Sequence, residues 1–515
     1  MEESKTSNLA WLPFLLGLCT SIGMYAGYKL QIPKTDYNIN KEYVNPSYAS
    51  QQKFQDVLSY LQSKYVDSLN YEETSDFLIQ QLMYALDPYS EYLEKKELKS
   101  LKDDLDGIYQ GAGISFRIID DQAYISNIVL DGPASKVGLE PGDIVKEINS
   151  RVLLSNNMQI DSIVEFTLLD KEKMSLVIQK SDNLVDQKIV IDKTDIKNFS
   201  IGPVTLLDNA TFYLKISRFG ENTYKEFMRE VEEYVYTKKF HNIVIDLRSN
   251  SGGLLNSAAD ILNQLVQEPN TVLFKTKDRN NQERVYKSTG KPFFNIEKIY
   301  ILIDKNTASA SEVLAGVLQD LNRAKIIGSN SFGKATVLEL FPLADGSALE
   351  LANARIYLPS GRCIQKSYNT KVDSNLHWLS PFIADTSVIH KGGKSYSYGV
   401  GIIPDVFVNN SEQDSIQDEE LKELVSDFVI TNYQSLKILV NKKNEESLIS
   451  TFALKNWINI SHDKFIIKNK DAILKELKFQ IVRFFEGENA EKILHLNSDS
   501  TIIKTIELLK QDIQK

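Results

Sequence analysis

The sequence predicts a multidomain α+β protein with an N-terminal membrane helix, a helical segment, a small β-rich domain, a larger mixed α/β core and a helical C-terminal region. Three features support this prediction. A charge-free apolar run comes first, and short β-rich runs punctuated by Gly and Pro follow from about residue 109. After about residue 192, apolar strands alternate with turns and helices. The length of 515 residues suits about three or four domains.

The apolar run is residues 9–28, which carry no charged side chain. A helix of this length spans about 30 Å, the thickness of the hydrocarbon layer of a membrane. We interpret it as a retained signal-anchor helix; the alternatives are a cleaved signal peptide and a buried helix of a soluble protein. Lys5 precedes the run and Lys29 and Lys34 follow it, so the positive-inside rule leaves the orientation open.

Periodicity and composition divide the rest of the chain. Apolar side chains at helical spacing, such as Phe54, Val57 and Leu61, are followed by the β-rich runs and then by two apolar runs typical of buried strands. The last hundred or so residues are charged and amphipathic, and they carry no chemical motif. The expected parts are 9–28 (membrane anchor), 46–102 (helical), 103–185 (β-rich), 190–409 (mixed α/β core) and 410–515 (helical).

Composition excludes several classes of function. The chain has 59 basic and 69 acidic side chains and a net charge of −10, so it has no overall attraction for nucleic acid, and none is expected as a partner. Two cysteines, Cys19 and Cys363, and five scattered histidines form neither a disulfide framework nor a zinc cluster. No metal and no cofactor are therefore expected, and any chemistry falls to hydroxyls, carboxylates, lysines and backbone amides.

Two turns that follow apolar strands could supply reactive groups. In the first, 246–255, Gly252 and Gly253 would let backbone N–H groups face a developing negative charge beside a helix N-terminus, although a tight strand-to-helix turn is the simpler interpretation. In the second, 306–316, small residues would expose Ser309 or Ser311, and each of these is also a plausible helix cap. A serine hydroxyl needs a base to act as a nucleophile.

Lys334 is a candidate for that base. It lies between Gly333 and Ala335 among apolar residues, and burial would lower its pKa towards the range in which a neutral amine accepts a proton. An exposed loop lysine is the alternative. His241, His377 and His390 lie in no recognisable motif.

Taken in order, segments of the chain between about residues 55 and 405 resemble the carboxyl-terminal processing peptidases, which are membrane-associated or exported serine proteases with a PDZ domain. No single motif decides the resemblance, but their order along the chain does. The segments are Leu86–Ser90, Gly111–Phe116, Gly132–Val145, Asp246–Arg248 with Gly252–Gly253, Ala308–Glu312, Phe332–Lys334, Pro359–Arg362 and Gly401–Asp405.

The resemblance implies a role for each matching residue. Ser309 would be the nucleophile, with Ser311 as its rival, and Lys334 would be the general base. The backbone amides of Gly253 and Ala310 would stabilise the oxyanion. One position departs from the family pattern: Leu338 stands where the family commonly has a glutamine that holds the lysine. The third catalytic member is then either missing or supplied elsewhere, although a Ser/Lys dyad remains chemically sufficient.

The resemblance also implies that residues 103–185 form a PDZ-like domain that recruits substrate and gates the site. It would bind an extended peptide and its terminal carboxylate at the positions Gly111, Gly113, Ile114 and Phe116, which otherwise suit an ordinary turn and core. The expected function is a serine endopeptidase that cleaves proteins near their C-termini. A catalytically weak or inactive PDZ scaffold that binds protein C-termini is the alternative.

The expected location follows from the anchor: membrane-bound, with the catalytic part extracytoplasmic (periplasmic), and a cleaved, exported form as the second choice. The expected partners are proteins or peptides with free C-termini and the membrane, together with a homo-oligomer or an adaptor.

Overall fold

The computed structural model describes residues 48–153, 172–180, 183–368, 382–385, 387–391, 394–408, 416–441, 470–486, 496 and 499–513. The chain divides into two compact units, Met1–Ser75 and Asp76–Lys515. The expected anchor at 9–28 lies outside the described residues. Among the residues that are described, no helix has both the length and the apolar character needed to cross a membrane.

The helical segment consists of three helices and one short strand. Helix α2 (Tyr48–Lys64) belongs to the first unit, and α3 (Tyr71–Leu86) crosses from the first into the second. Strand β1 (Glu91–Leu93) and α4 (Lys95–Asp106) follow. Helix α4 ends at Gly107, which adopts the left-handed conformation with φ 67° that favours glycine at this position.

The β-rich part is an antiparallel sheet with strand order β3-β4-β5-β7-β8, and β6 pairs with β5. Its buried face is formed by alternate side chains such as Ile125, Ile148 and Leu176. Strand β8 runs to Asp192, beyond residue 185. The elements are β3 (Ile114–Ile119), β4 (Gln122–Ile128), the short helix α5 (Pro133–Lys136), β5 (Ile144–Ile148), β6 (Arg151–Val152), β7 (Lys173–Lys180) and β8 (Asn183–Asp192). Separately, β2 (Ile108–Gly111) pairs with β9 (Thr194–Lys197).

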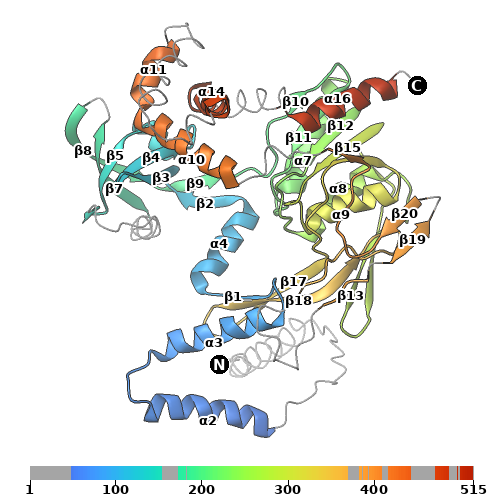
Figure 1. Ribbon diagram of the computed structural model, residues 1–515, viewed down its shortest axis with the longest axis horizontal. Coiled ribbons are helices and arrows are strands. Elements are labelled where there is room, and N and C mark those ends of the chain that lie inside the picture. Colours follow the sequence, from blue (N-terminus) through green and yellow to red (C-terminus); the bar gives the residue numbers. More distant parts are fainter. Residues whose placement is uncertain are drawn as a thin grey trace, which may run out of the picture. The chain divides into compact units, whose positions relative to one another are not determined.

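The mixed α/β core is built on a second sheet, of order β10-β11-β12-β15-β16-β21, which is parallel except for β10 (Figure 1). The two apolar runs at 243–245 and 299–303 lie in β12 and β15. Helices α7, α8 and α9 connect the parallel strands and pack on one face of the sheet. Right-handed connections between strands that follow one another in the same direction place all their helices on the same face. The bounds are β10 (Thr205–Leu206), β11 (Thr211–Lys215), α7 (Thr223–Glu232), the π-helical turn η1 (Glu233–Thr237), β12 (Asn242–Asp246), α8 (Leu255–Leu265), β15 (Lys298–Ile303), α9 (Ala310–Asp320), β16 (Ala324–Gly328) and β21 (Val406–Phe407).

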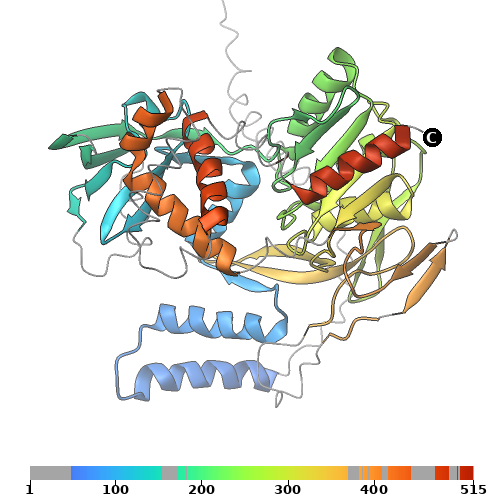
Figure 2. The same ribbon diagram turned by 45° about the horizontal axis from the view of Figure 1, so that its top comes forward.

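The opposite face of this sheet is covered by α16 (Ser500–Ile513), which lies across the strands (Figure 2). Strand side chains alternate between the two faces: Ile243 and Ile245 point towards α7–α9, whereas Val244 packs with Ile502 and Leu509 of α16. A parallel sheet is buried on both faces. Helix α16 is therefore a layer of the mixed α/β core, which periodicity alone did not reveal.

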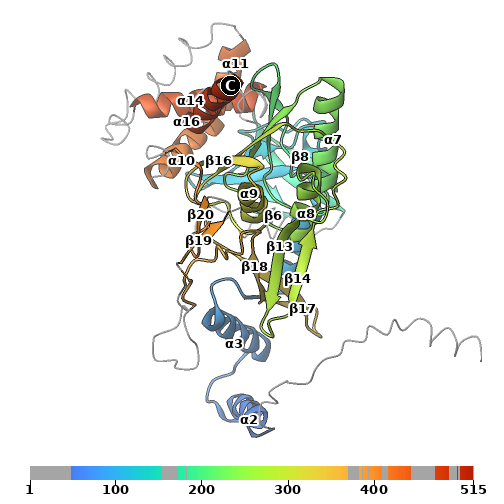
Figure 3. The same ribbon diagram turned by 90° about the vertical axis from the view of Figure 1, so that its right-hand side faces the viewer.

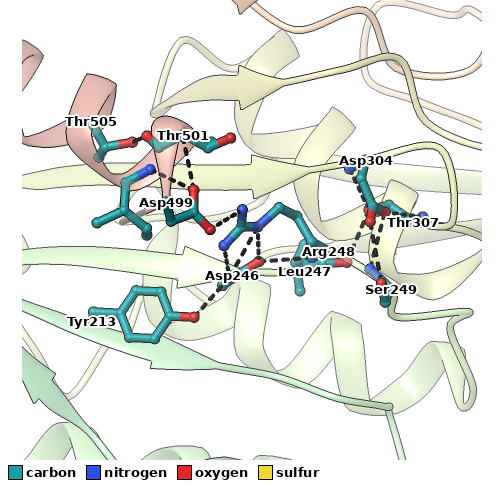
Figure 4. Close-up of polar contacts among 11 residues, drawn as sticks. Tyr213, Asp246, Leu247, Arg248, Ser249, Asp304, Thr307, Asp499, Thr501 and Thr505 are labelled. Atoms are coloured by element: carbon teal, nitrogen blue, oxygen red, sulfur yellow. Dashed lines mark hydrogen bonds and ion pairs between the residues drawn. The ribbon is translucent and has the colours of Figure 1, made fainter. Parts of the chain in front are cut away.

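An ion pair fastens the start of α16 to the end of β12 (Figure 4). Arg248 donates to Asp246 through Nη2 (2.7 Å) and to Asp499 through Nη1 (2.6 Å). The other oxygen of Asp499 accepts the N–H of Thr501 (2.8 Å), as an N-cap does. The Tyr213 hydroxyl donates to Asp246 (2.7 Å). Asp499 thus holds both its own helix and the turn after β12.

Replacing Asp499 by asparagine should lower the free energy of unfolding by about 1–2 kcal/mol, because the cap is kept while the charge beside Arg248 is lost. Asp499→Ala should cost about 1 kcal/mol more, since it also removes the cap. Urea unfolding measures both. Glu507→Gln is the matched control, because its exposed pair with Lys504 on α16 contributes little. Equal stability of all three variants would contradict this role of Asp499.

A third sheet, antiparallel, has the order β1-β18-β13-β14, with β17 on the other side of β18 (Figure 3). In this sheet β1, which comes from the helical segment, pairs with β18, and Glu91 of β1 lies opposite Glu350 of β18. The strands are β13 (Val272–Asp278), β14 (Glu283–Lys287), β17 (Thr336–Pro342) and β18 (Ala348–Tyr357), and the hairpin β19 (Val388–Lys391) and β20 (Lys394–Ser397) follows.

The other described C-terminal helices share an apolar core of their own and contact the β-rich sheet. Asp427 forms an ion pair with Arg117 of β3, and Glu140 accepts hydrogen bonds from Gln434 (2.8 Å) and Lys437 (2.6 Å). The C-terminal region therefore contacts both the β-rich sheet and the core. The helices are α10 (Ile416–Thr431), α11 (Tyr433–Asn441) and α14 (Lys470–Glu486).

Candidate active site

Ser309 lies at the turn between β15 and α9, where it is the N-cap residue of the helix. Its backbone has φ 53° and ψ −119°, a conformation that a residue with a side chain adopts only when its surroundings enforce it. Asp304 fixes the start of the turn, because its Oδ1 accepts the N–H groups of Asn306 and Thr307, each at 3.0 Å. The side chain of Ser309 is half-buried, so its hydroxyl remains within reach of a substrate.

The rival nucleophile, Ser311, is in a different environment. Its side chain is fully buried, and its hydroxyl donates to the carbonyl oxygen of Asn250 at 3.1 Å. The N–H of Ala308 donates to the same oxygen at 3.0 Å. Ser311 therefore joins the serine turn to the glycine turn after β12, and its geometry favours Ser309 as the reactive residue.

Gly252 brings the glycine turn against Ser309. A Cβ atom at Gly252 would lie 2.7 Å from the Cβ of Ser309, 2.9 Å from the carbonyl oxygen of Ala308 and 3.1 Å from the amide nitrogen of Ala310. Gly252 has φ 110°, which a side chain also disfavours. Close approach of the two turns thus depends on a residue without a side chain.

Two backbone N–H groups beside Ser309 remain available. Within the described ranges, neither Gly253 nor Ala310 donates a backbone hydrogen bond. The neighbours of Gly253 are used: the carbonyl oxygen of Gly252 accepts from Phe219 (2.8 Å), and Leu254 donates to Phe219 (2.7 Å). Ala310 is the first residue of α9, where N–H groups have no partner inside the helix. This arrangement suits an oxyanion that develops next to Ser309.

Gly252→Ala should lower kcat about 100-fold or more, because the added methyl group would push the glycine turn away from Ser309. Peptide cleavage and melting temperature should be measured together. Gly138→Ala is the control: it also has positive φ, 75°, but no atom lies within 4 Å of the added carbon. A Gly252→Ala enzyme as active as the Gly138→Ala enzyme would refute this account of the turn.

Glu312 connects the nucleophile to the candidate base. Its carboxylate is fully buried and accepts four hydrogen bonds. Oε2 accepts the N–H of Ser309 (3.0 Å) and the N–H of Lys334 (2.8 Å). Because both amides bind the same oxygen atom, their nitrogens lie close together. Oε1 accepts the N–H of Gly333 (2.7 Å) and the hydroxyl of Ser331. One carboxylate thus fixes both turns.

Burial raises the pKa of Glu312 to about 7, although its four donors act in the opposite direction. Ser309 and Glu312 have the spacing of a capping box, in which the acid reaches back to the first residue. This capping-box spacing was the signal in the sequence that could have identified Glu312 as a residue that binds the serine turn.

Lys334 lies between the buried residues Gly333 and Ala335, and its own side chain is half-buried. Burial lowers the pKa of its amine, against the opposing effect of nearby carboxylates. The Nζ atom lies 5.0 Å from the ring centroid of Tyr89. Among the described contacts there is no hydrogen bond between Nζ and the Ser309 hydroxyl. Such bonds often form only when substrate is present.

Leu338 lies in β17 opposite Ala352 of β18, just after a bulge. Its apolar side chain offers no hydrogen bond to the amine, as the sequence analysis anticipated. Instead, Gln365 binds the backbone directly after Lys334: its Oε1 accepts the N–H of Ala335 at 2.9 Å. No motif in the sequence indicated Tyr89 or Gln365 as neighbours of the lysine.

The four expected peptide-binding positions lie together in the β-rich part. Gly111 ends β2, Gly113 has φ 72°, and Ile114 and Phe116 of β3 pack against the core of the sheet. Gly111 lies in the β2-β9 pair and Ile114 and Phe116 in the sheet of β3, whereas Ser309 and Lys334 lie in turns next to strands of the other two sheets.

Comparisons with known proteins found a matching family model and similar curated proteins. The model of peptidase family S41 matches residues 210–375, a range that includes both turns and Lys334. A carboxy-terminal-processing protease of Bartonella bacilliformis is 27% identical over 67% of this chain and 78% of that protein. The carboxy-terminal processing protease CtpB of Bacillus subtilis is 28% identical over 61% of this chain and 65% of that protein.

Among solved structures, the photosystem II D1 C-terminal processing protease overlaps 71% of this chain and 89% of its own, with 20% identity and a TM-score of 0.38. The two sequence relatives and the matching family model define the class of the protein, which is a serine-type peptidase. More particularly, residues 210–375 match peptidase family S41, and the resemblance to carboxyl-terminal processing peptidases is confirmed.

Proposed function

We propose that the protein is an endopeptidase that cleaves protein substrates near their C-termini through an acyl-enzyme on Ser309, with Lys334 as the base. The observation that carries this proposal is the carboxylate of Glu312, which binds the backbone of both residues through a single oxygen. Nucleophile and base lie 25 positions apart in the sequence, and this contact supports their acting together.

The mechanism begins when the hydroxyl of Ser309 attacks the scissile carbonyl carbon and its proton passes to the neutral amine of Lys334. The N–H groups of Gly253 and Ala310 stabilise the oxyanion of the tetrahedral intermediate. The C–N bond then breaks, and the leaving amine takes the proton from Lys334. Water attacks the acyl-enzyme and gives a proton to Lys334. The bond between the carbonyl carbon and Oγ then breaks, Lys334 returns the proton to Oγ of Ser309, and the new C-terminal carboxylate leaves.

The test uses the full chain, an unfolded protein substrate with a free C-terminus, and a fluorophosphonate that acylates reactive serines. The expected result is cleavage near the C-terminus and a mass increase on the peptide that contains Ser309. Binding of the substrate without cleavage or labelling would overturn the proposal and favour the PDZ scaffold, for which Leu338 is the motivating observation.

We further propose that the β-rich part acts as a PDZ-like domain that recruits C-terminal peptides at Gly111, Gly113, Ile114 and Phe116. Support comes from the left-handed backbone of Gly113, with φ 72°, and from the position of β3 at the edge of its sheet, where an extended peptide can add a strand. A fluorescent peptide with a free C-terminal carboxylate should bind more tightly than the same peptide with a C-terminal amide. Equal affinities would refute carboxylate capture.

For the location we propose attachment to a membrane through residues 9–28, with the peptidase on the extracytoplasmic (periplasmic) side, and a cleaved, exported form as the second choice. The charge-free run supports this proposal. Fractionation of cells, followed by protease treatment of intact and opened cells, distinguishes the two forms and would exclude both if the protein stayed in the cytoplasm. As further partners we propose a second copy of the chain or an adaptor protein.

A further inference from the structure

The amine of Lys334 needs a partner that Leu338 cannot provide. A lysine side chain has four rotatable bonds, so a base built from it works only if its amine is held in one place. The nearest aromatic contact is the ring of Tyr89, whose centroid lies 5.0 Å from Nζ. A cation at this distance from a ring is attracted to the negative charge on the ring face.

Tyr89 is itself fixed by a rigid turn, which explains the sequence Leu86–Ser90. Asp87 accepts the N–H groups of Tyr89 (2.8 Å) and Ser90 (2.7 Å), and the Ser90 hydroxyl donates to its other oxygen (2.7 Å). The same hydroxyl accepts the N–H of Ala352 at 3.1 Å. Ala352 is the residue opposite Leu338 in the sheet, so the turn is attached to the strand pair that carries the altered position.

Gln365 fixes the ring from the side of its hydroxyl. Its Nε2 donates to the Tyr89 hydroxyl at 2.9 Å, and its Oε1 accepts the N–H of Ala335 (2.9 Å) and the hydroxyl of Thr336 (2.8 Å). Gln365 is only 1% exposed, so these bonds are protected from water. One buried amide thus links the ring to the two residues that directly follow Lys334.

We propose that Tyr89, held by Gln365, is the positioning residue for the amine of Lys334. It would take the role that the glutamine has in the family pattern, where this chain has Leu338. The inference rests on the proposed function. Its catalytic benefit lies in the proton transfer: as Lys334 accepts the proton of Ser309, the ring stabilises the ammonium that forms.

Two cationic side chains lie in this region: the charge of Arg355 acts on Tyr89, and Lys366 lies against Gly333. Four carboxylates act on the Lys334 amine, and they are Glu350 of β18, Glu91 of β1, Asp87 of the turn and Glu312 of α9. None of them forms an ion pair with Nζ within 4.0 Å in the described part of the chain. Each attracts an ammonium, so without the ring the amine would be free to move towards Glu350 and Glu91 and away from Ser309.

The test compares kcat and the pH profile of kcat/KM for wild type, Tyr89→Phe and Tyr89→Leu. Tyr89→Phe keeps the ring and should stay within about threefold of wild type. Tyr89→Leu keeps apolar bulk but loses the ring, so kcat should fall about tenfold and the acidic limb should move to lower pH by on the order of half a unit. Adding Leu338→Gln to Tyr89→Leu should restore part of kcat, because an amide again holds the amine.

Tyr92→Leu is the control, since it removes a ring three residues away whose hydroxyl donates to Asp76 instead. It should lower the melting temperature without moving the acidic limb. Unchanged kcat and pH profile in Tyr89→Leu, or an equal shift in Tyr92→Leu, would overturn the inference and leave the proposed function intact. A wild-type enzyme that neither cleaves nor is labelled at Ser309 would instead overturn the proposed function.

Discussion

Ser309→Ala is expected to lower kcat by about 10⁴-fold or more, because the proposed acyl-enzyme forms on the hydroxyl of Ser309. The fold should persist, since the side chain of Ser309 is half-buried and the substitution removes a single oxygen. Cleavage of an unfolded substrate with a free C-terminus measures the loss, and the melting temperature confirms that the variant is folded.

Ser311→Ala is the matched control for this prediction. It removes the buried hydrogen bond to the carbonyl oxygen of Asn250, so it should lower the free energy of unfolding by about 1 kcal/mol. Most of the activity should remain. If Ser309→Ala cleaved as fast as wild type while Ser311→Ala did not, Ser311 would be the nucleophile.

Glu312→Gln is expected to lower both activity and stability strongly. The carboxylate accepts four hydrogen bonds, whereas the amide of glutamine offers one oxygen and places an NH₂ group against two donors. Each buried donor left without an acceptor costs about 1–3 kcal/mol. Because the N–H groups of Ser309 and Lys334 are among the four, kcat should fall by about 100-fold.

The pH dependence of unfolding identifies the contribution of Glu312. The pKa of its carboxyl is about 7 in the fold, against an ordinary value of 4.5, so the folded state holds the proton more tightly than the unfolded state. Its contribution to stability is therefore largest below pH 4.5 and is lost as the pH rises through 7. Urea unfolding at several pH values should show this slope in wild type and not in Glu312→Gln.

Glu283→Gln is the control for the glutamate, since Glu283 forms an exposed pair with Lys275 at 3.0 Å. It should leave kcat and the pH dependence between 4.5 and 7 unchanged. A Glu312→Gln enzyme with the activity of the Glu283→Gln enzyme would show that the shared carboxylate does not position the two residues.

The sequence allowed the local parts of the site to be predicted. The apolar runs 243–245 and 299–303 lie in adjacent parallel strands, so the turns that follow them meet at one edge of the sheet. Glycines in one turn and small residues in the other were local signals for free backbone amides and an exposed hydroxyl, and the family resemblance brought the two together. Each of these signals extends over only a few residues.

The parts that could not be predicted depend on distant contacts. Gln365 and Tyr89 are 276 positions apart, and Arg248 and Asp499 are 251 positions apart. Neither pair has a local pattern, because an amide, a phenol or a carboxylate at such positions is compatible with many exposed sites. The layer formed by α16 was hidden for the same reason: an amphipathic helix shows that it has an apolar face, but not which surface covers that face.

Helix α16 also sets an order of events during synthesis of the chain. The strand face that includes Val244 and Leu302 is buried only when Ile502 and Leu509 lie against it. A ribosome-bound chain that already contains Ser309 and Lys334 lacks this cover, because α16 is translated more than 150 residues after the lysine. Both faces of this sheet can therefore be covered only after α16 has been synthesised, which is later than the synthesis of the candidate site residues.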